Sequence, residues 1–185
     1  MARHGGPKVM STPETGHCVS LREAVHEDCE QIFQWRNDPW IISLGASGQP
    51  VEFDEHAAWF QRVLRDTNRK LHVVCLDTGD EAGVTRVDLI DQERAVITVY
   101  LMQEFTGAGR GVEAIRLTST LAFEAWPSLT AIHASILKSN ERSIAAFGKA
   151  GFDICPDPHR IKQDSNLSEM RCLRNKKVEC DDSTF

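Results

Sequence analysis

Residues 100–126 (YLMQEFTGAGRGVEAIRLTSTLAFEAW) combine an alternating strand-like segment, a glycine-rich turn and a long helical segment in direct succession. In the turn, residues 106–111, three glycines within five positions allow positive φ angles and a close approach of the backbone to a ligand. The first amide groups of the following helix have no partner within that helix and attract anions. The stretch therefore predicts a turn that binds a diphosphate.

Two common phosphate-binding loops do not account for this turn. A P-loop requires Lys and then Ser or Thr after its last glycine, whereas Gly111 is followed by Val112 and Glu113. A dinucleotide-binding loop follows the first strand of a βαβ unit, whereas this turn follows several predicted strands. A ligand-free strand-to-helix turn remains the simpler alternative.

Length and charge narrow the class of protein. A chain of 185 residues with 41% hydrophobic content is most simply one globular domain with a full core. The net charge of -6, without a block of like charge, predicts neither a nucleic-acid partner nor a membrane partner. An anionic ligand would then be held by local cations and by backbone dipoles.

The cysteines and the N-terminus indicate a reducing compartment. The six cysteines form no Cys-x-x-Cys pair and have no histidine at zinc-site spacing, so we expect no metal site. The N-terminal segment has no apolar signal region, and no apolar run approaches the ~18 residues of a membrane span. These features predict a cytoplasmic protein.

The chain is predicted to form one domain, residues 17–174. Residues 1–16 are rich in Gly, Pro, Ser and Thr and are predicted to be a disordered leader, and residues 175–185 are predicted to be a mobile tail. Periodicity predicts strands at residues 18–25, 71–76, 84–90, 95–102, 131–137, 152–155 and 169–173. It predicts helices at residues 26–38, from Asp54, at 112–125 and at 141–150.

This order predicts an α/β domain of the α+β kind, with a mixed, mostly antiparallel sheet of about seven strands and about four helices. Pro39 is expected to stop the first helix, residues 40–50 to form a loop, and Asp54 to cap the second helix. In the strand of residues 95–102, Ile97, Val99 and Leu101 share one face, and Thr98, Tyr100 and Met102 share the other.

Three motifs in this order resemble the GNAT superfamily of acyl-CoA-dependent N-acetyltransferases across residues 18–174. The first is the strand and glycine turn of residues 100–111, and the second is NERS at 140–143 followed by FGKAGF at 147–152. The third, Trp35-Arg36-Asn37 with His56 and Trp59-Phe60, is similar to the branch of sugar-nucleotide amine and ribosomal-protein amine acetyltransferases.

The resemblance implies that acetyl-CoA is a co-substrate and that the sheet splays at a central strand, commonly at a bulge. The backbone N–H of Met102 is then the expected donor to the acetyl oxygen, and Lys138 or Arg142 would meet the adenosine phosphates. The implied cofactor-binding residues are Leu101, Met102, Gly107, Ala108, Gly109, Arg110, Gly111, Asn140, Ser143 and Phe147.

The chain departs from the family pattern at two positions. Thr106 stands where the family usually has Arg or Gln, and Phe147 stands where many relatives carry a tyrosine that protonates the departing thiolate. Arg110 is expected to compensate for the first change, and Ser143 or a water for the second. These departures keep a degenerate acyl-CoA-binding domain without turnover as an alternative.

Catalytic candidates are Tyr100, His56 and Ser143, and acceptor-binding candidates are Arg36, His56 and Tyr100. The pKa of a histidine suits a base near neutral pH, whereas a tyrosine is a poor base that can bond the amine. An arginine in an acceptor pocket suits a phosphate or a carboxylate. The structural alternatives are a satisfied core histidine, a half-buried strand aromatic and a helix-terminal salt bridge.

The predicted function is direct transfer of the acetyl group to a primary amine of a small acceptor, with a nucleotide-linked amino sugar favoured. An amine flanked by electron-withdrawing oxygens titrates near the ~7.7–8.0 of an α-amino group and needs little base catalysis. Acetylation of protein N-termini is the alternative within the same chemistry. A homodimer is left open by the sequence.

Overall fold

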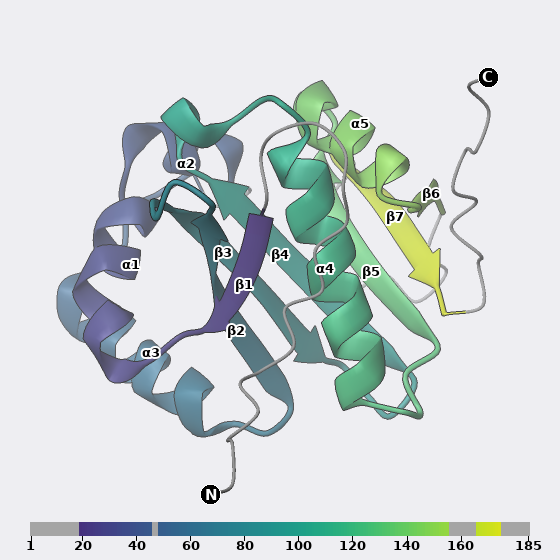
Figure 1. Ribbon diagram of the computed structural model, residues 1–185, viewed down its shortest axis with the longest axis horizontal. Coiled ribbons are helices and arrows are strands. Elements are labelled where there is room, and N and C mark those ends of the chain that lie inside the picture. Colours follow the sequence, from purple (N-terminus) through teal and green to yellow (C-terminus); the bar gives the residue numbers. More distant parts are fainter. Residues whose placement is uncertain (1–18, 46–47, 156–165, 175–185) are drawn as a thin grey trace, which may run out of the picture.

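The computed structural model describes residues 19–45, 48–155 and 166–174 (Figure 1). The predicted leader of residues 1–16 and the predicted tail of residues 175–185 lie outside this part of the chain. The order of helices and strands follows the prediction, with one further short helix.

One seven-stranded sheet runs through the molecule in the order β1-β2-β3-β4-β5-β7-β6. Its strands are β1 (Val19–Glu23), β2 (Arg69–Leu76), β3 (Glu81–Leu89), β4 (Arg94–Leu101), β5 (Ala131–Leu137), β6 (Asp153–Ile154) and β7 (Leu167–Leu173). All neighbouring strands are antiparallel except β4 and β5, which are parallel. The predicted mixed, mostly antiparallel sheet is therefore confirmed.

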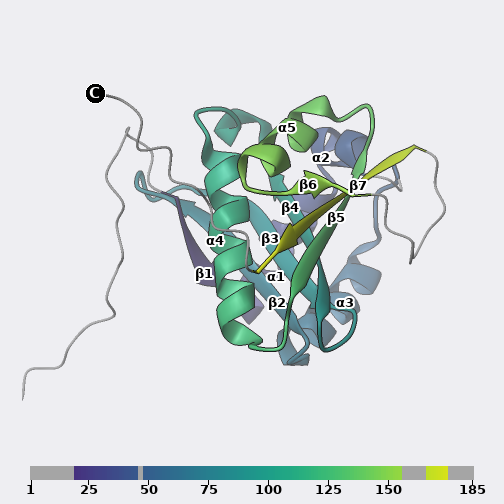
Figure 2. The same ribbon diagram turned by 90° about the vertical axis from the view of Figure 1, so that its right-hand side faces the viewer.

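Helices cover both faces of this sheet (Figures 1 and 2). They are α1 (Cys29–Arg36), α2 (Pro39–Leu44), α3 (Phe53–Arg65), α4 (Arg110–Ala125) and α5 (Glu141–Lys149), with short 3-10 turns η1 (His26–Asp28) and η2 (Gln103–Phe105). Helices α4 and α5 pack on one face around Ile115, Ile132 and Phe147. Helices α1 and α3 pack on the other face, where Ile32 and Phe60 are fully buried.

The two faces of β4 serve these two cores, as its alternating pattern predicts. Ile97 packs in the core under α4 and α5, and Leu101 packs against Ala114 of α4. Tyr100 and Met102 pack with the α1 and α3 side. A single strand thus separates two differently lined spaces.

The prediction that Pro39 stops a helix and that residues 40–50 form a loop is wrong in part. Helix α1 already ends at Arg36, and Pro39 is the first residue of α2. The Asp38 carboxylate accepts a hydrogen bond from the backbone N–H of Trp40 at 2.8 Å and caps the new helix. Proline suits this position because its missing N–H would have no helical partner there.

The predicted cap of the next helix is also wrong. Helix α3 begins at Phe53, the residue before Asp54, with Glu52 at the capping position and no side-chain cap. Asp54 instead lies in the first turn, where its charge favours the helix dipole.

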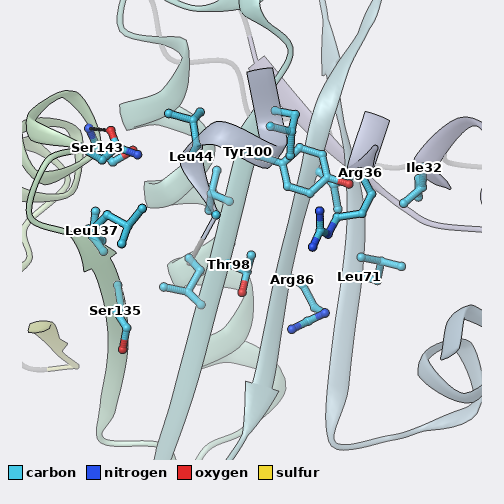
Figure 3. A pocket seen from close by; sticks show the side chains of 18 of the residues that line it. Ile32, Arg36, Leu44, Leu71, Arg86, Thr98, Tyr100, Ser135, Leu137 and Ser143 are labelled. Carbon is cyan, nitrogen blue, oxygen red and sulfur yellow. Dashed lines mark hydrogen bonds between the residues drawn. The ribbon is translucent and has the colours of Figure 1, made fainter. Parts of the chain in front are cut away.

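The predicted divergence at a central strand is confirmed between β4 and β5. Their parallel pairing is recorded at Arg94–Ala131, Ala95–Ile132 and Val96–His133 in the described residues, all in the first half of β4. Figure 3 shows the cavity beside the later part of β4, where Thr98 and Tyr100 point into it.

The expected bulge is not in β4. Its register with β3 is continuous from Leu89–Ala95 to Gly83–Leu101. The irregularity lies between β2 and β3, at Val74 and Cys75. The divergence from β5 is therefore not caused by an extra residue in β4 opposite β3.

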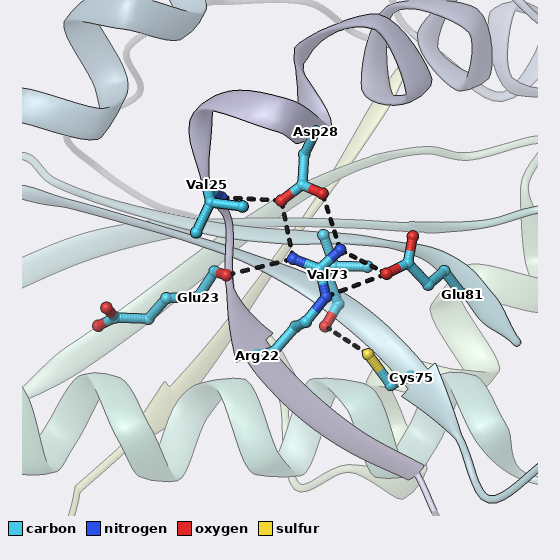
Figure 4. Close-up of polar contacts among 7 residues, drawn as sticks. All are labelled: Arg22, Glu23, Val25, Asp28, Val73, Cys75 and Glu81. Carbon is cyan, nitrogen blue, oxygen red and sulfur yellow. Dashed lines mark hydrogen bonds and ion pairs between the residues drawn. The ribbon is translucent and has the colours of Figure 1, made fainter. Parts of the chain in front are cut away.

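An ion cluster joins Arg22 of the edge strand β1 to Asp28 of η1 and Glu81 of β3 (Figure 4). The guanidinium of Arg22 donates to both carboxylate oxygens of Asp28, at 2.8 and 2.7 Å, and its Nε donates to Glu81 at 3.0 Å. Asp28 also accepts from the backbone N–H of Val25 at 2.8 Å, which holds the turn before α1. The Arg22 guanidinium, more than the opposing burial, lowers the pKa of the Asp28 carboxyl.

We expect Asp28→Asn to lower the free energy of unfolding at pH 7 by roughly 1.5–3 kcal/mol, the scale of a charge-assisted hydrogen bond. Because the pKa of Asp28 is depressed in the folded state, its contribution is present above the unfolded pKa, about 3.9, and is lost as pH falls through the folded value. Urea unfolding at pH 7 and below pH 4 measures this, with exposed Asp77→Asn as the control. A difference independent of pH would contradict the assignment.

Candidate active site

The glycine turn adopts the backbone conformation that its composition predicts. Gly107, Ala108 and Gly109 have φ angles of 97°, 47° and 77° in succession. A Cβ atom added at Gly107 or Gly109 would meet no atom within 4 Å, so the turn borders empty space on that side. Helix α4 begins at Arg110 without a side-chain cap, so the first-turn amides of Gly111 and Val112 lack acceptors within the helix.

A cavity of about 390 Å³ lies against this turn. From the turn and β4 it is lined by Val99, Tyr100, Leu101, Thr106, Gly107, Ala108, Gly109 and Gly111, and from α5 and its start by Asn140, Arg142, Ser143, Phe147 and Lys149. We call it the turn cavity. Of the residues predicted to bind a cofactor, Met102 and Arg110 do not line it, and neither does Lys138.

The backbone N–H of Met102, predicted to contact the acetyl oxygen, is occupied. It donates to the carbonyl of Ala82 at 2.9 Å, as part of the β3–β4 ladder. In an antiparallel pair, successive residues point their amides alternately toward and away from the partner strand. The amides of Leu101 and Val99 therefore point toward the β5 side, where β4 and β5 diverge, and both residues line the turn cavity.

The start of α5 closes the same cavity. The side-chain oxygen of Asn140 accepts a hydrogen bond from the backbone N–H of Ser143 at 3.1 Å, so Asn140 caps this helix. Phe147 is buried and packs edge-on against Phe152, with ring centroids 5.0 Å apart. The NERS motif is thus explained by helix capping, while its side chains also border the cavity.

A second cavity, of about 530 Å³, lies between α1, α2, α3 and the sheet (Figure 3). We call it the acceptor cavity. It shares six lining residues with the turn cavity: Leu44, Val99, Tyr100, Asn140, Ser143 and Phe147. The two spaces therefore meet where β4 and the first turns of α5 face each other.

The structure brings Arg36, His56, Tyr100 and Ser143 to the wall of the acceptor cavity, although they come from four separate elements or their boundaries. In Figure 3, Arg36 and Tyr100 point into the same space. The Nη2 group of Arg36 lies 3.5 Å from the carbonyl of Gln49, a long contact.

Tyr100 is half-buried at the junction of the two cavities. Burial raises the pKa of its phenol above the usual range, and the nearby charges of Arg36 and Arg86 oppose that rise only in part. The hydroxyl is therefore protonated at neutral pH. Tyr100 can donate a hydrogen bond there but is a poor base.

His56 is buried among Phe33, Trp59 and Phe60, with ring centroids 5.3 to 6.0 Å away. Its Nε2 lies 3.1 Å from the carbonyl of Cys29, and because a carbonyl only accepts, Nε2 carries the hydrogen. Burial lowers the pKa of the imidazole, with a smaller contribution from Arg36. His56 is neutral at pH 7, and its Nδ1 is the remaining acceptor.

Sequence reasoning missed the other charged residues of the acceptor cavity, Glu55, Arg62 and Arg86. Arg86 is one of three charged residues in β3, with Glu81 and Asp88, and periodicity gave no sign of its role. In the described residues, no cluster of three His, Cys, Asp or Glu side chains is placed to bind a metal. No helix in the same part of the chain is long and apolar enough to cross a membrane.

A family model described as an acetyltransferase (GNAT) domain matches residues 19–153, which is most of the chain. The chain belongs to the GNAT acetyltransferase family. It is an N-acetyltransferase that uses acetyl-CoA as co-substrate. No protein in a comparison with curated sequences matches it.

Solved structures share the fold of this GNAT domain. Spermidine N-acetyltransferase from Vibrio cholerae, in complex with CoA and spermine, is 19% identical over 85% of this chain and 96% of that chain, with a TM-score of 0.74. Aminoglycoside acetyltransferase AAC(6')-Ib, in complex with coenzyme A and kanamycin, is 20% identical over 85% and 95%, with a TM-score of 0.69. A domain from Methanocaldococcus jannaschii is 20% identical over 85% and 99%, with a TM-score of 0.73.

The residues of the turn cavity fit the co-substrate of this GNAT domain. The amides of Gly111 and Val112 at the start of α4 suit a pyrophosphate, and the divergent edge of β4 offers backbone groups to an extended chain. The indole N–H of Trp40, which borders this cavity, is buried and has no hydrogen-bond partner in the described residues. When bound, acetyl-CoA supplies the activated acyl group.

We expect acetyl-CoA at about 100 times its Kd to stabilise the fold by ~2.7 kcal/mol, because it binds the folded and not the unfolded chain. In a domain of this size the melting temperature would rise by roughly 5–10 °C. Thermal unfolding with and without acetyl-CoA measures this shift.

The same assay tests the turn itself through Gly109→Val, which we expect to abolish the shift. A valine would place a branched side chain in the empty space beside the turn and oppose its φ of 77°. Gly79→Val is the matched control, since Gly79 has a φ of 90° and no atom within 4 Å of an added Cβ, but lies in a distant hairpin. If Gly109→Val folds and binds acetyl-CoA normally, the turn has only a structural role.

Proposed function

We propose that this protein transfers the acetyl group of acetyl-CoA to the primary amine of a small acceptor, by direct attack in a ternary complex, and that a nucleotide-linked amino sugar is the favoured acceptor. The observation that carries the proposal is the meeting of two cavities at Tyr100 and Ser143. One cavity borders the glycine turn, and the other carries Arg36. We place this reaction in the cytoplasm, as the cysteine usage suggests.

The two solved neighbours with named substrates also support an amine acceptor. Their names describe acetyltransferases of spermidine and of aminoglycosides, which are both amines. At 19–20% identity this likeness concerns the fold, so the choice of amine must come from the residues of this chain.

The acceptor amine must be neutral to attack, and the site supports an amine of low pKa. Tyr100 is protonated and His56 is a weakened base, so neither is suited to deprotonate a lysine-like amine. An amine on a sugar ring, with a pKa nearer ~7.7–8.0, is partly neutral without help. Tyr100 would then orient the nitrogen by a hydrogen bond, and the amide of Leu101 would face the acetyl oxygen in place of Met102.

Departure of CoA needs little assistance from the protein. A thiol with a pKa near ~8.5 leaves readily as thiolate. Ser143, at the junction of the cavities, is our candidate to protonate the departing thiolate, because the side chain of Phe147 has no hydrogen-bond donor. Release of free thiol from acetyl-CoA with a panel of amines tests turnover, and binding without release would favour a degenerate acyl-CoA-binding domain.

We expect Arg36→Lys to lower kcat/KM for a UDP-linked amino sugar by roughly 10- to 150-fold. Lysine keeps the charge but loses the bidentate geometry that holds a phosphate, and one charge-assisted hydrogen bond is worth roughly 1.5–3 kcal/mol. The Kd of acetyl-CoA should hardly change, because Arg36 does not line the turn cavity. Steady-state kinetics and equilibrium titration measure the two quantities.

Arg65→Lys is the matched control for this experiment. Arg65 is exposed at the end of α3 and lines neither cavity. An unchanged kcat/KM in Arg36→Lys would assign Arg36 a structural role at the end of α1. A parallel loss of acetyl-CoA affinity would mean that the acceptor has been assigned to the wrong side of β4.

A further inference from the structure

We propose that Arg86 is a specificity-determining residue: with Arg36, it makes the acceptor cavity select an amine that carries its own phosphate or carboxylate and disfavour polycationic amines. This inference rests on the proposed function for the identity of the cavity. It adds the charge of the acceptor and a residue that recognises it.

The position of Arg86 is fixed by its neighbours on the cavity wall. Its guanidinium carbon lies 5.3 Å from the centroid of the Trp59 ring, and its Nε lies 2.9 Å from a carboxylate oxygen of Asp88. The side chain is only 27% exposed. Figure 3 shows its guanidinium in the same space as Arg36 and Thr98.

The Nε donor of Arg86 is not used in a hydrogen bond within the described residues. Its Nε and Asp88 are close enough for an ion pair but are not aligned for a hydrogen bond. Asp88 also faces Arg69 at 3.8 Å, although Arg69 lies closer to Asp66, at 3.1 Å. The Nε of Arg86 is buried and has no hydrogen-bond partner in the described residues, and the guanidinium carries four further N–H donors.

An acceptor that meets these donors must bring oxygen atoms, and the charge of the wall favours an anion. Among the described residues that line the cavity, three are arginines, Arg36, Arg62 and Arg86, and one has a carboxylate, Glu55, in a chain whose net charge is -6. A phosphate or a carboxylate binds guanidinium groups in a planar, charge-assisted arrangement. A molecule with several ammonium groups would meet like charges instead.

The guanidinium groups of Arg36 and Arg86 also lie close enough to Tyr100 to affect its pKa. The charges of Arg36 and Arg86 both oppose the rise in the pKa of Tyr100, the residue where the two cavities meet. An acceptor whose anionic group contacts the guanidinium groups can therefore place an amine beside Tyr100. The cavity, of about 530 Å³, has room for a sugar with an attached phosphate.

Equilibrium titration of the CoA-saturated protein tests this without turnover, and saturation keeps a nucleotide out of the turn cavity. The ligands are a UDP-linked amino sugar for phosphate, glutamate for carboxylate, the methyl glycoside of the amino sugar, which has the amine but no anionic group, and spermidine. We expect the UDP-linked compound, or glutamate if carboxylate is the recognised group, to bind more tightly than the methyl glycoside and spermidine, with an affinity that falls as salt rises.

Arg86→Gln should weaken the preferred anion by about 10- to 100-fold and leave the methyl glycoside within about twofold. Arg65→Gln removes the same charge outside both cavities and should change neither. Arg86→Lys, which keeps the charge without the planar fork, should fall between the wild type and Arg86→Gln. The thermal shift with acetyl-CoA confirms that each variant is folded.

Tighter binding of spermidine than of either anion by the wild type would overturn the inference, whatever the variants do. So would equal losses of the anion and the methyl glycoside in Arg86→Gln, since that pattern indicates a general disturbance of the wall. Failure of the proposed function is a different result: anions bind as expected, but no amine releases thiol from acetyl-CoA.

Discussion

The short parallel pairing of β4 with β5 is the constraint on which both cavities depend. The two strands pair at three positions and then separate, so the later backbone groups of β4 on that edge need other partners. The opposite edge of β4 cannot provide them, because its ladder with β3 is continuous. This close pairing requires glycine at position 83, because a Cβ atom there would lie 2.2 Å from the carbonyl oxygen of Tyr100. A strand fixed on one edge and released on the other offers its amides to a ligand.

The divergent strand also explains how a chain of net charge -6 holds an anionic co-substrate beside a cationic acceptor cavity. The α4 side of β4 leads to the glycine turn, where the amides at the start of α4 suit a diphosphate and where Arg142 and Lys149 of α5 line the same cavity. The opposite side carries Tyr100 and faces the arginines of α1, α3 and β3. Both cavities therefore carry positive groups, with backbone amides prominent in the turn cavity and arginine side chains in the acceptor cavity.

Features of the fold that depend on local sequence patterns could be predicted. Features that depend on contacts between distant residues, or on a choice between two local interpretations, could not. Alternation and the glycine turn were enough to predict the sheet and the turn into α4, whereas the divergence at the central strand was implied by the resemblance to GNAT proteins. Pro39 was interpreted as a stop, although after a capping Asp38 it also begins a helix. Asn140, predicted to bind the co-substrate, lines the turn cavity and also caps α5, a role that was not predicted from the sequence. The position of Arg86 on the cavity wall depends on its contacts with Trp59, which lies on another element, and with Asp88. No pattern within β3 could therefore predict its place in the site.

The ionisable groups of the site together affect the protonation state of the acceptor amine. Burial raises the pKa of Tyr100 and lowers that of His56, so both groups are uncharged around neutral pH, and the fixed charges are those of arginines and of Glu55. The guanidinium charges disfavour an ammonium ion near Tyr100 and so favour the neutral amine that attacks. A cavity of this kind lowers the pKa of its substrate instead of supplying a strong base. Under the proposed function, this places the acid–base requirement on the acceptor and suits an amine that is already weakly basic and carries a negative charge of its own.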